Sequence, residues 1–309
     1  GFGYEEEDIE LRYYLDSTHY TKVADDITAD EDGSWEATFT IPASGKGSHK
    51  IDAKGYDSTL SDVDDVTFTV KPGISLSATE GYVGDSRTVS GSGFASSETS
   101  IKVTYDDEQV GTSTTAAADG TWEVSFEVPA SAKGSHEIDA YGSSTSAADI
   151  GDKDFTIKPK MVLSPETSAR SPGYVGTSLE LSGSGFAAEK SVSIKYDGSQ
   201  VATTTTDAAG SFPSTSFTVP QSKHGEHTVT VSDAVGNKPP TPAIFVMESN
   251  APPKPTLSAP ANGSRIGLVR KQAPAFEWSA VEDESGVTYN LQVATDATFT
   301  QSVVLANGL

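Results

Sequence analysis

Three histidines recur at one matched position of the chain, and imidazole is a common metal ligand and proton carrier. His49, His136 and His227 each follow a glycine by two residues. A zinc ligand lies about 2.1 Å from its ion. One such histidine falls in each successive unit of the chain. Units stacked end to end would place the histidines roughly 35–40 Å apart, so they cannot converge on one metal ion within the chain. We therefore expect each histidine to cap the start of a strand. His224 and His227 are close enough in sequence for a weak surface metal site.

Acidic side chains gather in residues 1–72, where 17 acidic residues face 6 basic ones. Calcium prefers six to eight oxygen ligands. Asp30 and Asp32 belong to a fragment of a calcium-loop pattern, and Asp25 and Asp26 precede it. Two interpretations of these four carboxylates stay open. They form a calcium site, or they are part of a solvated acidic surface. We expect the solvated surface, and no other cofactor or metal.

Catalytic motifs are missing from the sequence. It contains no nucleophile elbow, no Walker loop, no His-Glu-x-x-His and no dinucleotide fingerprint. We therefore expect a protein that is not an enzyme. Asn262 begins an Asn-Gly-Ser sequon, which is a formal glycosylation site and equally an ordinary exposed loop.

The composition excludes several classes of partner. The formal net charge is −23, which opposes binding to nucleic acid and to anionic lipid headgroups. The absence of cysteine excludes disulfides, thiol catalysis and thiolate metal sites. No apolar run approaches the roughly 20 residues that span a membrane.

Internal repeats organise the chain. Gly-Tyr-Val-Gly stands at residues 81–84 and 173–176, and each copy leads to Ser-Gly-Ser-Gly-Phe, ending at Phe94 and Phe186. Both motifs recur after 92 residues, and the same step back from Phe94 reaches Phe2. Each unit is completed by three further features: a turn of the Asp-Gly-x-Trp type, a proline and the recurrent histidine. We define repeats 1, 2 and 3 as residues 1–72, 73–159 and 160–249, and the C-terminal segment as residues 250–309.

Each repeat has the pattern of short strands. In residues 121–128 apolar and polar side chains alternate, which predicts a strand with one buried face, and residues 34–41 repeat the pattern. The third copy contains Pro213 and one extra residue, which predicts a bulge or an edge position. Residues 101–105, 137–141, 192–196 and 228–231 are further expected strands. The expected core residues are Trp35, Phe39, Trp122, Phe126, Phe212, Phe217 and Trp278.

The repeats resemble bacterial and archaeal immunoglobulin-like (Ig-like) surface repeats, and their glycine-rich openings are similar to IPT/TIG domains. Residues 274–278 and 287–293 resemble the second and third strands of a fibronectin type III domain, here truncated at its C-terminus. The resemblance implies an all-β fold of tandem Ig-like β-sandwich domains arranged as an elongated rod. About seven strands in a unit of this size fits that fold.

Repeat 1 lacks about 20 residues that correspond to residues 73–92, the first two strands of a sandwich. Without them the sandwich exposes its core and sheet edges. Two explanations stay open. The natural chain extends beyond both ends of this one, which we favour, or a neighbouring molecule donates the missing strands.

These features predict an extracellular, non-enzymatic structural protein, a stalk or assembly segment of a large cell-surface protein of adhesin or surface-layer type. One alternative is a subunit of a surface filament or sheath, polymerised by strand donation or lateral contacts. The other is an adhesion module that binds carbohydrate or protein through its loops. The expected partners are other protein domains or copies of the chain itself, with carbohydrate as a further option.

Overall fold

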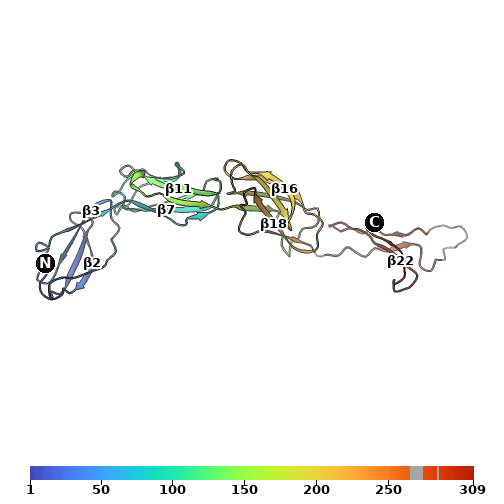
Figure 1. The fold of residues 1–309 in the computed structure, drawn as a ribbon, viewed down its shortest axis with the longest axis horizontal. Helices are drawn as coiled ribbons and strands as arrows, with labels where there is room; N and C mark the ends of the chain where they lie inside the picture. The colour runs from blue at the N-terminus through green and yellow to red at the C-terminus, as the bar shows by residue number, and fades with distance from the viewer. Residues whose placement is uncertain (249, 265–273, 284) are drawn as a thin grey trace. The chain divides into compact units, whose positions relative to one another are not determined.

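The computed structural model describes residues 1–248, 250–264, 274–283 and 285–309 (Figure 1). The described chain is all-β apart from one short 3₁₀ turn, η1 (Ala147–Asp149). Two compact units form: unit 1 holds Gly1–Lys160 with Ser184–Ala188 and Ala208–Ser211, and unit 2 holds the remainder. Within the described ranges, no helix has the length and apolar character to cross a membrane.

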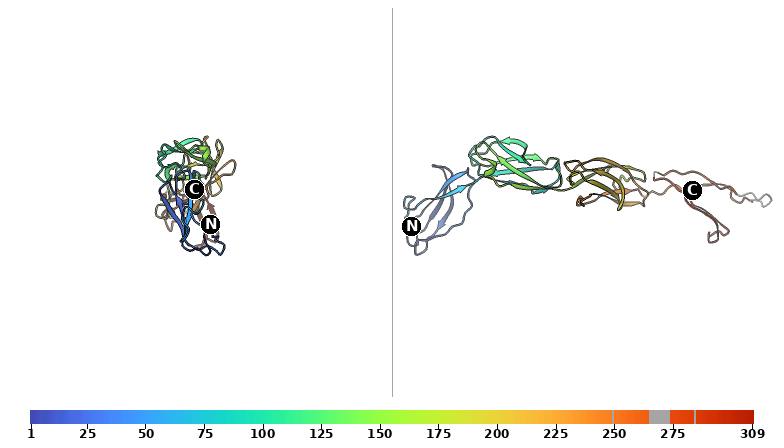
Figure 2. Two further views of the ribbon diagram at one scale, coloured as in Figure 1. Left: turned by 90° about the vertical axis from the view of Figure 1, so that its left-hand side faces the viewer. Right: turned by 45° about the horizontal axis from the view of Figure 1, so that its top comes forward.

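Repeat 2 is an Ig-like β-sandwich of two sheets. One sheet has the order β10-β7-β5, and the other has the order β6-β12-β11-β8-β9. β6 and β12 pair in parallel, and the other pairs are antiparallel. Figures 1 and 2 show the sheet of β11 and the sheet of β7 as two facing layers. The strands are β5 (Gly73–Leu76), β6 (Glu80–Gly81), β7 (Ser86–Ser92), β8 (Ile101–Tyr105), β9 (Glu108–Thr114), β10 (Trp122–Glu127), β11 (Gly134–Tyr141) and β12 (Lys153–Ile157).

The core of repeat 2 follows from the alternation of its strands. In β10 every second residue is buried, beginning with Trp122 and ending with Phe126, while the residues between them are exposed. β8 supplies Ile101, Val103 and Tyr105 from the opposite sheet. Period-two strands place such residues on one face, so the two faces meet as a single apolar layer.

Repeat 3 has the same Ig-like architecture. Its sheets have the orders β13-β14-β17 and β16-β15-β18-β19. β17 is an edge strand that contains Pro213, and its pairing with β14 shifts register between Leu181 and Gly183. The expected edge position and irregular pairing are therefore confirmed. The strands are β13 (Lys160–Ser164), β14 (Ser178–Ser184), β15 (Ser191–Tyr196), β16 (Ser199–Thr205), β17 (Phe212–Thr218), β18 (Gly225–Asp233) and β19 (Ala243–Met247).

Repeat 1 forms one four-stranded antiparallel sheet of the order β2-β1-β3-β4. Its strands are β1 (Ile9–Tyr14), β2 (Tyr20–Ile27), β3 (Gly47–Lys54) and β4 (Val66–Val70). The strand expected at residues 34–41 is not among them, which corrects the sequence interpretation. A strand is defined by its ladder. In repeat 2 this ladder is formed with β7, and the position 92 residues before β7 lies ahead of Gly1.

The C-terminal segment contains two two-stranded sheets. β20 (Leu257–Ala259) pairs with β21 (Glu277–Trp278), and β22 (Leu291–Ala294) pairs with β23 (Ser302–Ala306). β21 falls within residues 274–278 and β22 overlaps residues 287–293, the two stretches that resemble fibronectin strands. The fibronectin-like assignment and the boundaries of all four sequence segments stay predictions.

Candidate functional site: the junction between consecutive repeats

A short loop precedes the histidine-bearing strand in every repeat, and a tyrosine from the same sheet holds it. The Tyr13 hydroxyl lies 2.7 Å from the Ser44 Oγ, and the Tyr105 hydroxyl lies 2.8 Å from the Ser131 Oγ. Each serine Oγ also lies within hydrogen-bonding distance of the carbonyl oxygen of the proline two residues earlier. Repeat 3 repeats the arrangement with Tyr196 and Ser222 at 3.2 Å. These loops therefore share one hydrogen-bonding arrangement.

The recurrent histidines close the same loops. The Nε2 atoms of His49, His136 and His227 lie 2.7–2.8 Å from the carbonyl oxygen of the residue four positions earlier. Each ring also stacks on the loop-holding tyrosine, with centroids 5.0–5.2 Å apart. The histidines lie near the starts of β3, β11 and β18, where they brace the loop.

The second ring nitrogen of each histidine has its own acceptor. His136 Nδ1 and His227 Nδ1 lie 2.6 Å from the carboxylates of Asp106 and Asp197. In repeat 1 the carbonyl oxygen of Tyr14 takes the place of the carboxylate, 3.0 Å from His49 Nδ1. Carboxylate and carbonyl oxygens only accept hydrogen bonds, so a neutral ring serves one of its two acceptors and a charged ring serves both.

The loop of one repeat contacts the glycine-rich opening of the next. The backbone amide of Lys46 donates to the carbonyl oxygen of Phe94 at 3.0 Å, and the amide of Lys133 donates to that of Phe186 at 2.9 Å. All four residues belong to unit 1. At the first of these contacts the Lys46 Nζ also donates to the carbonyl oxygen of Ser144. The same contact therefore occurs twice in the chain.

The connecting peptide packs against the same opening. Gly93 has φ +69°, and a Cβ added there would lie 2.5 Å from the carbonyl oxygen of Lys71. Gly185, its counterpart after repeat 2, has φ +73° and faces Lys158 in the same way. An L-residue is strained at such φ angles, and here it would also overlap the connecting backbone. The glycines before Phe94 and Phe186 thus have a junction-specific cause.

Buried glutamates anchor the opening to a second loop. Glu98 accepts hydrogen bonds from the backbone amides of Ala95, Ser144 and Thr145 at 2.7–2.9 Å and from the Thr145 hydroxyl at 2.8 Å. Glu6, which stands 92 residues earlier, accepts from Gly3, Asp57 and Ser58 in the same arrangement. Each carboxylate thereby ties two loops together at the end of its sheet.

The surroundings of these carboxylates favour the ionised form. The hydrogen bond from the Gly3 amide has the largest effect on the pKa of Glu6. Desolvation opposes it, and further hydrogen bonds from Ser58 and Asp57 bring this pKa down to about 2. Burial by itself raises the pKa of Glu98, but donors led by the Ser144 amide outweigh it, so this pKa also lies below its usual value. Hydrogen bonds to the charged form explain both shifts.

The expected core residues divide into two groups. Trp122, Phe126, Phe212 and Phe217 are buried. The remaining three, Trp35, Phe39 and Trp278, are half-buried. The first four lie on β10 and β17, which pair with β7 and β14, whereas Trp35 and Phe39 lie outside any named strand.

The acidic candidates do not gather into a metal site. Among the described residues, no group of three or more His, Asp or Glu side chains has the geometry to hold a metal ion. Asp32 accepts from the amide and hydroxyl of Ser34, and Asp25 pairs with Lys22 at 2.6 Å. The hydrogen bonds from Ser34 lower the pKa of Asp32. A calcium site at Asp25, Asp26, Asp30 and Asp32 receives no support from this geometry.

Asn262 is exposed in a turn, where the amide of Ser264 donates to the carbonyl oxygen of Ala261. Its side chain is accessible to a modifying enzyme, and its glycosylation stays a prediction.

Sequence reasoning missed the glutamate anchors and the amide contacts between repeats. Glu6 and Glu98 were visible only as one more pair at the 92-residue spacing. Their partners are mostly backbone amides, which carry no residue signature. The amide-to-carbonyl contact is likewise independent of the side chain at Lys46 or Lys133.

Comparison with known proteins finds no matching family model and no matching curated protein. Among solved structures, the chain is similar to a tetra-tandem repeat in the extending region of a large adhesion protein, with 18% identity over 84% of this chain and 71% of that one, at a TM-score of 0.27. It is similar to the Yersinia pseudotuberculosis adhesin InvE, with 12% identity over 63% of this chain and 70% of that one, at a TM-score of 0.28.

A third similar structure is the Bacteroides ovatus protein SGBP-B in complex with a mixed-linkage heptasaccharide. Its identity is 13% over 81% of this chain and 63% of that one, at a TM-score of 0.28. Superpositions this loose bear on no individual residue, ligand or partner of the present chain.

Proposed function

We propose that this chain is a non-enzymatic spacing segment of a large extracellular surface protein, in which consecutive Ig-like repeats are coupled by a repeated junction. One observation carries the proposal. The same loop amide meets the same phenylalanine carbonyl oxygen twice, from Lys46 to Phe94 and from Lys133 to Phe186. A repeat that only displayed a binding loop would have no need for this recurrence.

The internal construction of the repeats supports this reading. Tyrosine, serine and histidine hold each donating loop, and Glu98 holds the receiving end of repeat 2 through Ala95. A glycine at the receiving end leaves room for the connecting peptide. The recurrent polar groups thus lie at the ends where repeats meet. The strong negative charge keeps such a segment soluble and limits association with nucleic acid.

Replacement of one repeat in the source cell tests the proposal. An internal deletion of residues 73–159 shortens the segment by one repeat, and a second variant carries repeat 3 in place of repeat 2 and keeps the length. Antibodies against repeat 2 should label intact wild-type cells. The deletion should shorten the distance to which the protein extends from the cell surface, while the protein is still present on that surface. The swapped variant should restore the wild-type distance.

Labelling that requires permeabilised cells would contradict the extracellular assignment. If the deletion and the swapped variant lose function equally, the proposed spacing role would be contradicted. A ligand site within repeat 2 would then be favoured.

A further inference from the structure

Repeat 1 departs from the other two repeats at the hairpin that joins its first two strands. Tyr13 on β1 pairs with Thr21 on β2, and residues 14–20 connect the two. In repeats 2 and 3 the matching tyrosines pair with Glu108 and Ser199, and only two residues intervene in each case. We call residues 14–20 the long hairpin. A two-residue turn closes the same ladder elsewhere in the chain, so the ladder itself does not require the extra residues.

The tip of the long hairpin has a fixed conformation of its own. Asp16 Oδ1 accepts hydrogen bonds from the backbone amides of Thr18 and His19, both at 2.7 Å. Its second carboxylate oxygen lies 2.8 Å from His19 Nδ1. The bond from the Thr18 amide contributes most to a pKa of Asp16 below the usual range. A loop that is already ordered loses little conformational entropy when it binds a ligand.

Two cavities flank the long hairpin and share Leu15, Asp16 and His49 in their walls. The first has a volume of about 570 Å³ and reaches Lys50 on β3. The second has a volume of about 510 Å³ and reaches the loop of residues 43–46. Because the two cavities share these walls, they form one groove along the hairpin. Each volume lies within the range of about 300–1,000 Å³ that is typical of small-molecule sites.

Repeat 2 completes the second cavity. Four of its lining residues belong to that repeat, namely Ala95, Ser96, Ala118 and Asp119. The next residue of the same turn, Gly120, packs closely on repeat 1, since a Cβ added to it would lie 3.0 Å from Gly45 Cα. All of these residues belong to unit 1. The groove is therefore formed by the long hairpin and the first junction together.

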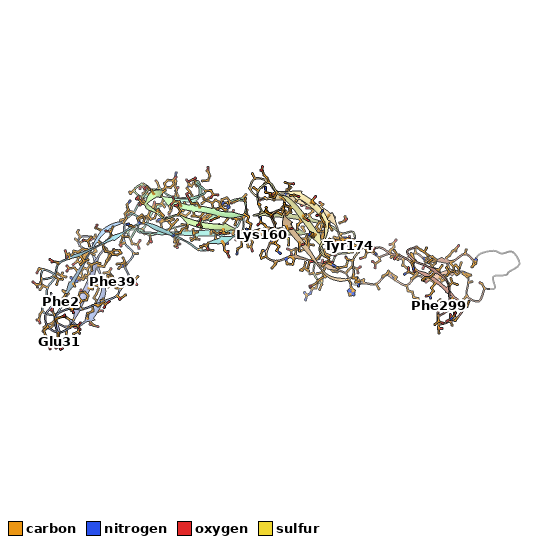
Figure 3. All side chains as sticks on the ribbon, in the orientation of Figure 1. Phe2, Glu31, Phe39, Lys160, Tyr174 and Phe299 are labelled. Atoms are coloured by element: carbon orange, nitrogen blue, oxygen red, sulfur yellow. The ribbon has the colours of Figure 1, made fainter. Side chains whose placement is uncertain are left out.

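The loop at the floor of the groove is equally accessible in repeat 2, where β5, β6 and β7 are present. Pro129 is half-buried and Ala130 is exposed there, and Pro42 and Ala43 have the same burial in repeat 1. The loop of repeat 1 follows shortly after Phe39, which Figure 3 labels. Strands equivalent to β5–β7 thus leave this place open. What distinguishes repeat 1 here is its long hairpin.

The polar lining of the groove suits a neutral ligand. Asp16 and Asp119 are balanced by Lys46 and Lys50, so the formal charge of the lining is zero with neutral histidines. Carboxylates accept hydrogen bonds and ammonium groups donate them, which together serve ligand hydroxyl groups in both directions. The excess of acidic residues in repeat 1 opposes a polyanion.

An apolar strip lies beside these polar groups. Leu15 is 39% exposed, and the rings of Tyr14 and Tyr20 lie 5.5 Å apart between centroids. Lys50 Nζ lies 4.4 Å from the centroid of the Tyr14 ring, a cation–π contact that holds this ring in place. Pyranose rings present C–H groups to aliphatic and aromatic surfaces while their hydroxyl groups form hydrogen bonds at the rim. The combination of surfaces in the groove therefore matches a sugar.

We propose that the groove along the long hairpin is a binding site for a neutral carbohydrate chain. One part of the chain packs on Tyr14 and Leu15, and another lies between the hairpin and Asp119 of repeat 2. A ligand held by both repeats also stabilises their junction, because it binds only the joined arrangement. The inference concerns binding and stands independently of the spacing role.

Four neutral oligosaccharides are the probes: cellohexaose, maltohexaose, laminarihexaose and N-acetylchitohexaose. Heparin serves as the anionic comparison. Amide NMR signals of the intact chain report the place of binding. We expect at least one of the four to shift the signals of residues 14–20 together with those of Ser96 and Asp119. Heparin should leave these signals unchanged.

A hairpin replacement supplies the matched variant. Residues 14–20 are replaced by Asp-Gly, the turn that Asp197 and Gly198 form in repeat 3. The new aspartate gives His49 the carboxylate partner that His227 has. This variant should keep the exchange protection of β1 and β3 and lose the ligand-induced shifts at Ser96 and Asp119.

Point variants separate the groove from the rest of the surface. Leu15→Asn should weaken binding about tenfold, because it removes apolar contact area from the groove. Thr203→Ala, at an exposed position of β16 in repeat 3, should bind as tightly as the wild type.

Three results would overturn the inference. The first is no shift with any of the four oligosaccharides at millimolar concentration. The second is a set of shifts that persists after the hairpin replacement, which would place the binding elsewhere. The third is binding of heparin in preference to the neutral oligosaccharides, which would contradict the class of ligand.

Discussion

The backbone amide of Lys46 lies 3.0 Å from the carbonyl oxygen of Phe94 and donates a hydrogen bond to it across the junction of repeats 1 and 2. The loop that carries Lys46 is itself held by Tyr13 and His49. A contact between two loops transmits force only when both loops are held. Tyr13 and His49 therefore fix the loop that donates at this junction.

The connecting peptide gives the first prediction. Gly93→Ala adds a Cβ that overlaps the Lys71 carbonyl oxygen, and Gly84→Ala adds one at φ +82° with no atom within 4 Å. Both variants carry the left-handed backbone cost of about 1–2 kcal/mol. We expect Gly93→Ala to lower the free energy of unfolding further than Gly84→Ala in chemical denaturation. Equal losses would show that the connecting peptide does not pack on Gly93.

The two repeated tryptophans should differ in their contributions. Trp122→Ala removes a buried ring and should cost repeat 2 about 3–5 kcal/mol. Trp35→Ala removes a half-buried ring and should cost repeat 1 distinctly less. Hydrogen exchange resolved by peptide separates the two repeats within the intact chain. Matching losses in exchange protection would contradict the difference in burial.

Acid should weaken the ends of the repeats through their glutamates. Because the folded-state pKa of Glu6 is lowered to about 2, its stabilising effect is complete above the ordinary value of 4.5 and disappears as the pH falls towards 2. The pKa of Glu98 is lowered in the same direction. Glu6→Gln and Glu98→Gln should flatten this decline in unfolding experiments between pH 5 and 2.

Glu127→Gln, at an exposed position of β10, is the matched control and should retain the wild-type decline. A steep decline in all three variants would locate the acid sensitivity in other carboxylates.

The tyrosine that holds the loop gives a prediction at high pH. Burial raises the pKa of Tyr105 to about 12, against a smaller lowering by Ser131. Its contribution to stability is therefore present below the ordinary value of 10 and is lost as the pH rises through about 12. Tyr105→Phe should cost about 1 kcal/mol at neutral pH. It should also remove one late-ionising phenol from the ultraviolet titration, which Tyr141→Phe should leave in place.

Much of the fold could be predicted from alternation and repetition. The expected strand at residues 101–105 matches β8, and the alternation around Trp122 matches the buried and exposed residues of β10. The same pattern at residues 34–41 predicted a strand that the structure lacks. Alternation reports which residues would face a core, but a strand also needs a partner, and no local pattern contains that information.

The candidate site was less predictable for the same physical reason. The recurrence of His136 marked its position, yet its partners, the Ala132 carbonyl and Asp106, depend on how two strands and a loop meet. A backbone carbonyl accepts a hydrogen bond whatever side chain its residue carries, so the residue type at Ala132 gives no signal. The junction was therefore visible only as glycine spacing, whose cause emerges from the approach of the Lys71 carbonyl oxygen to Gly93.

A distance distribution across the first junction tests the central claim most directly. The chain has no cysteine, so Thr67→Cys on β4 and Thr112→Cys on β9, both exposed, accept spin labels selectively. Pulsed electron paramagnetic resonance should give one narrow distance distribution, which a flexible Gly-Ser insertion after Pro72 should broaden strongly. A parent distribution as broad as that of the insertion variant would show that repeats 1 and 2 move independently and would contradict the coupled-repeat account.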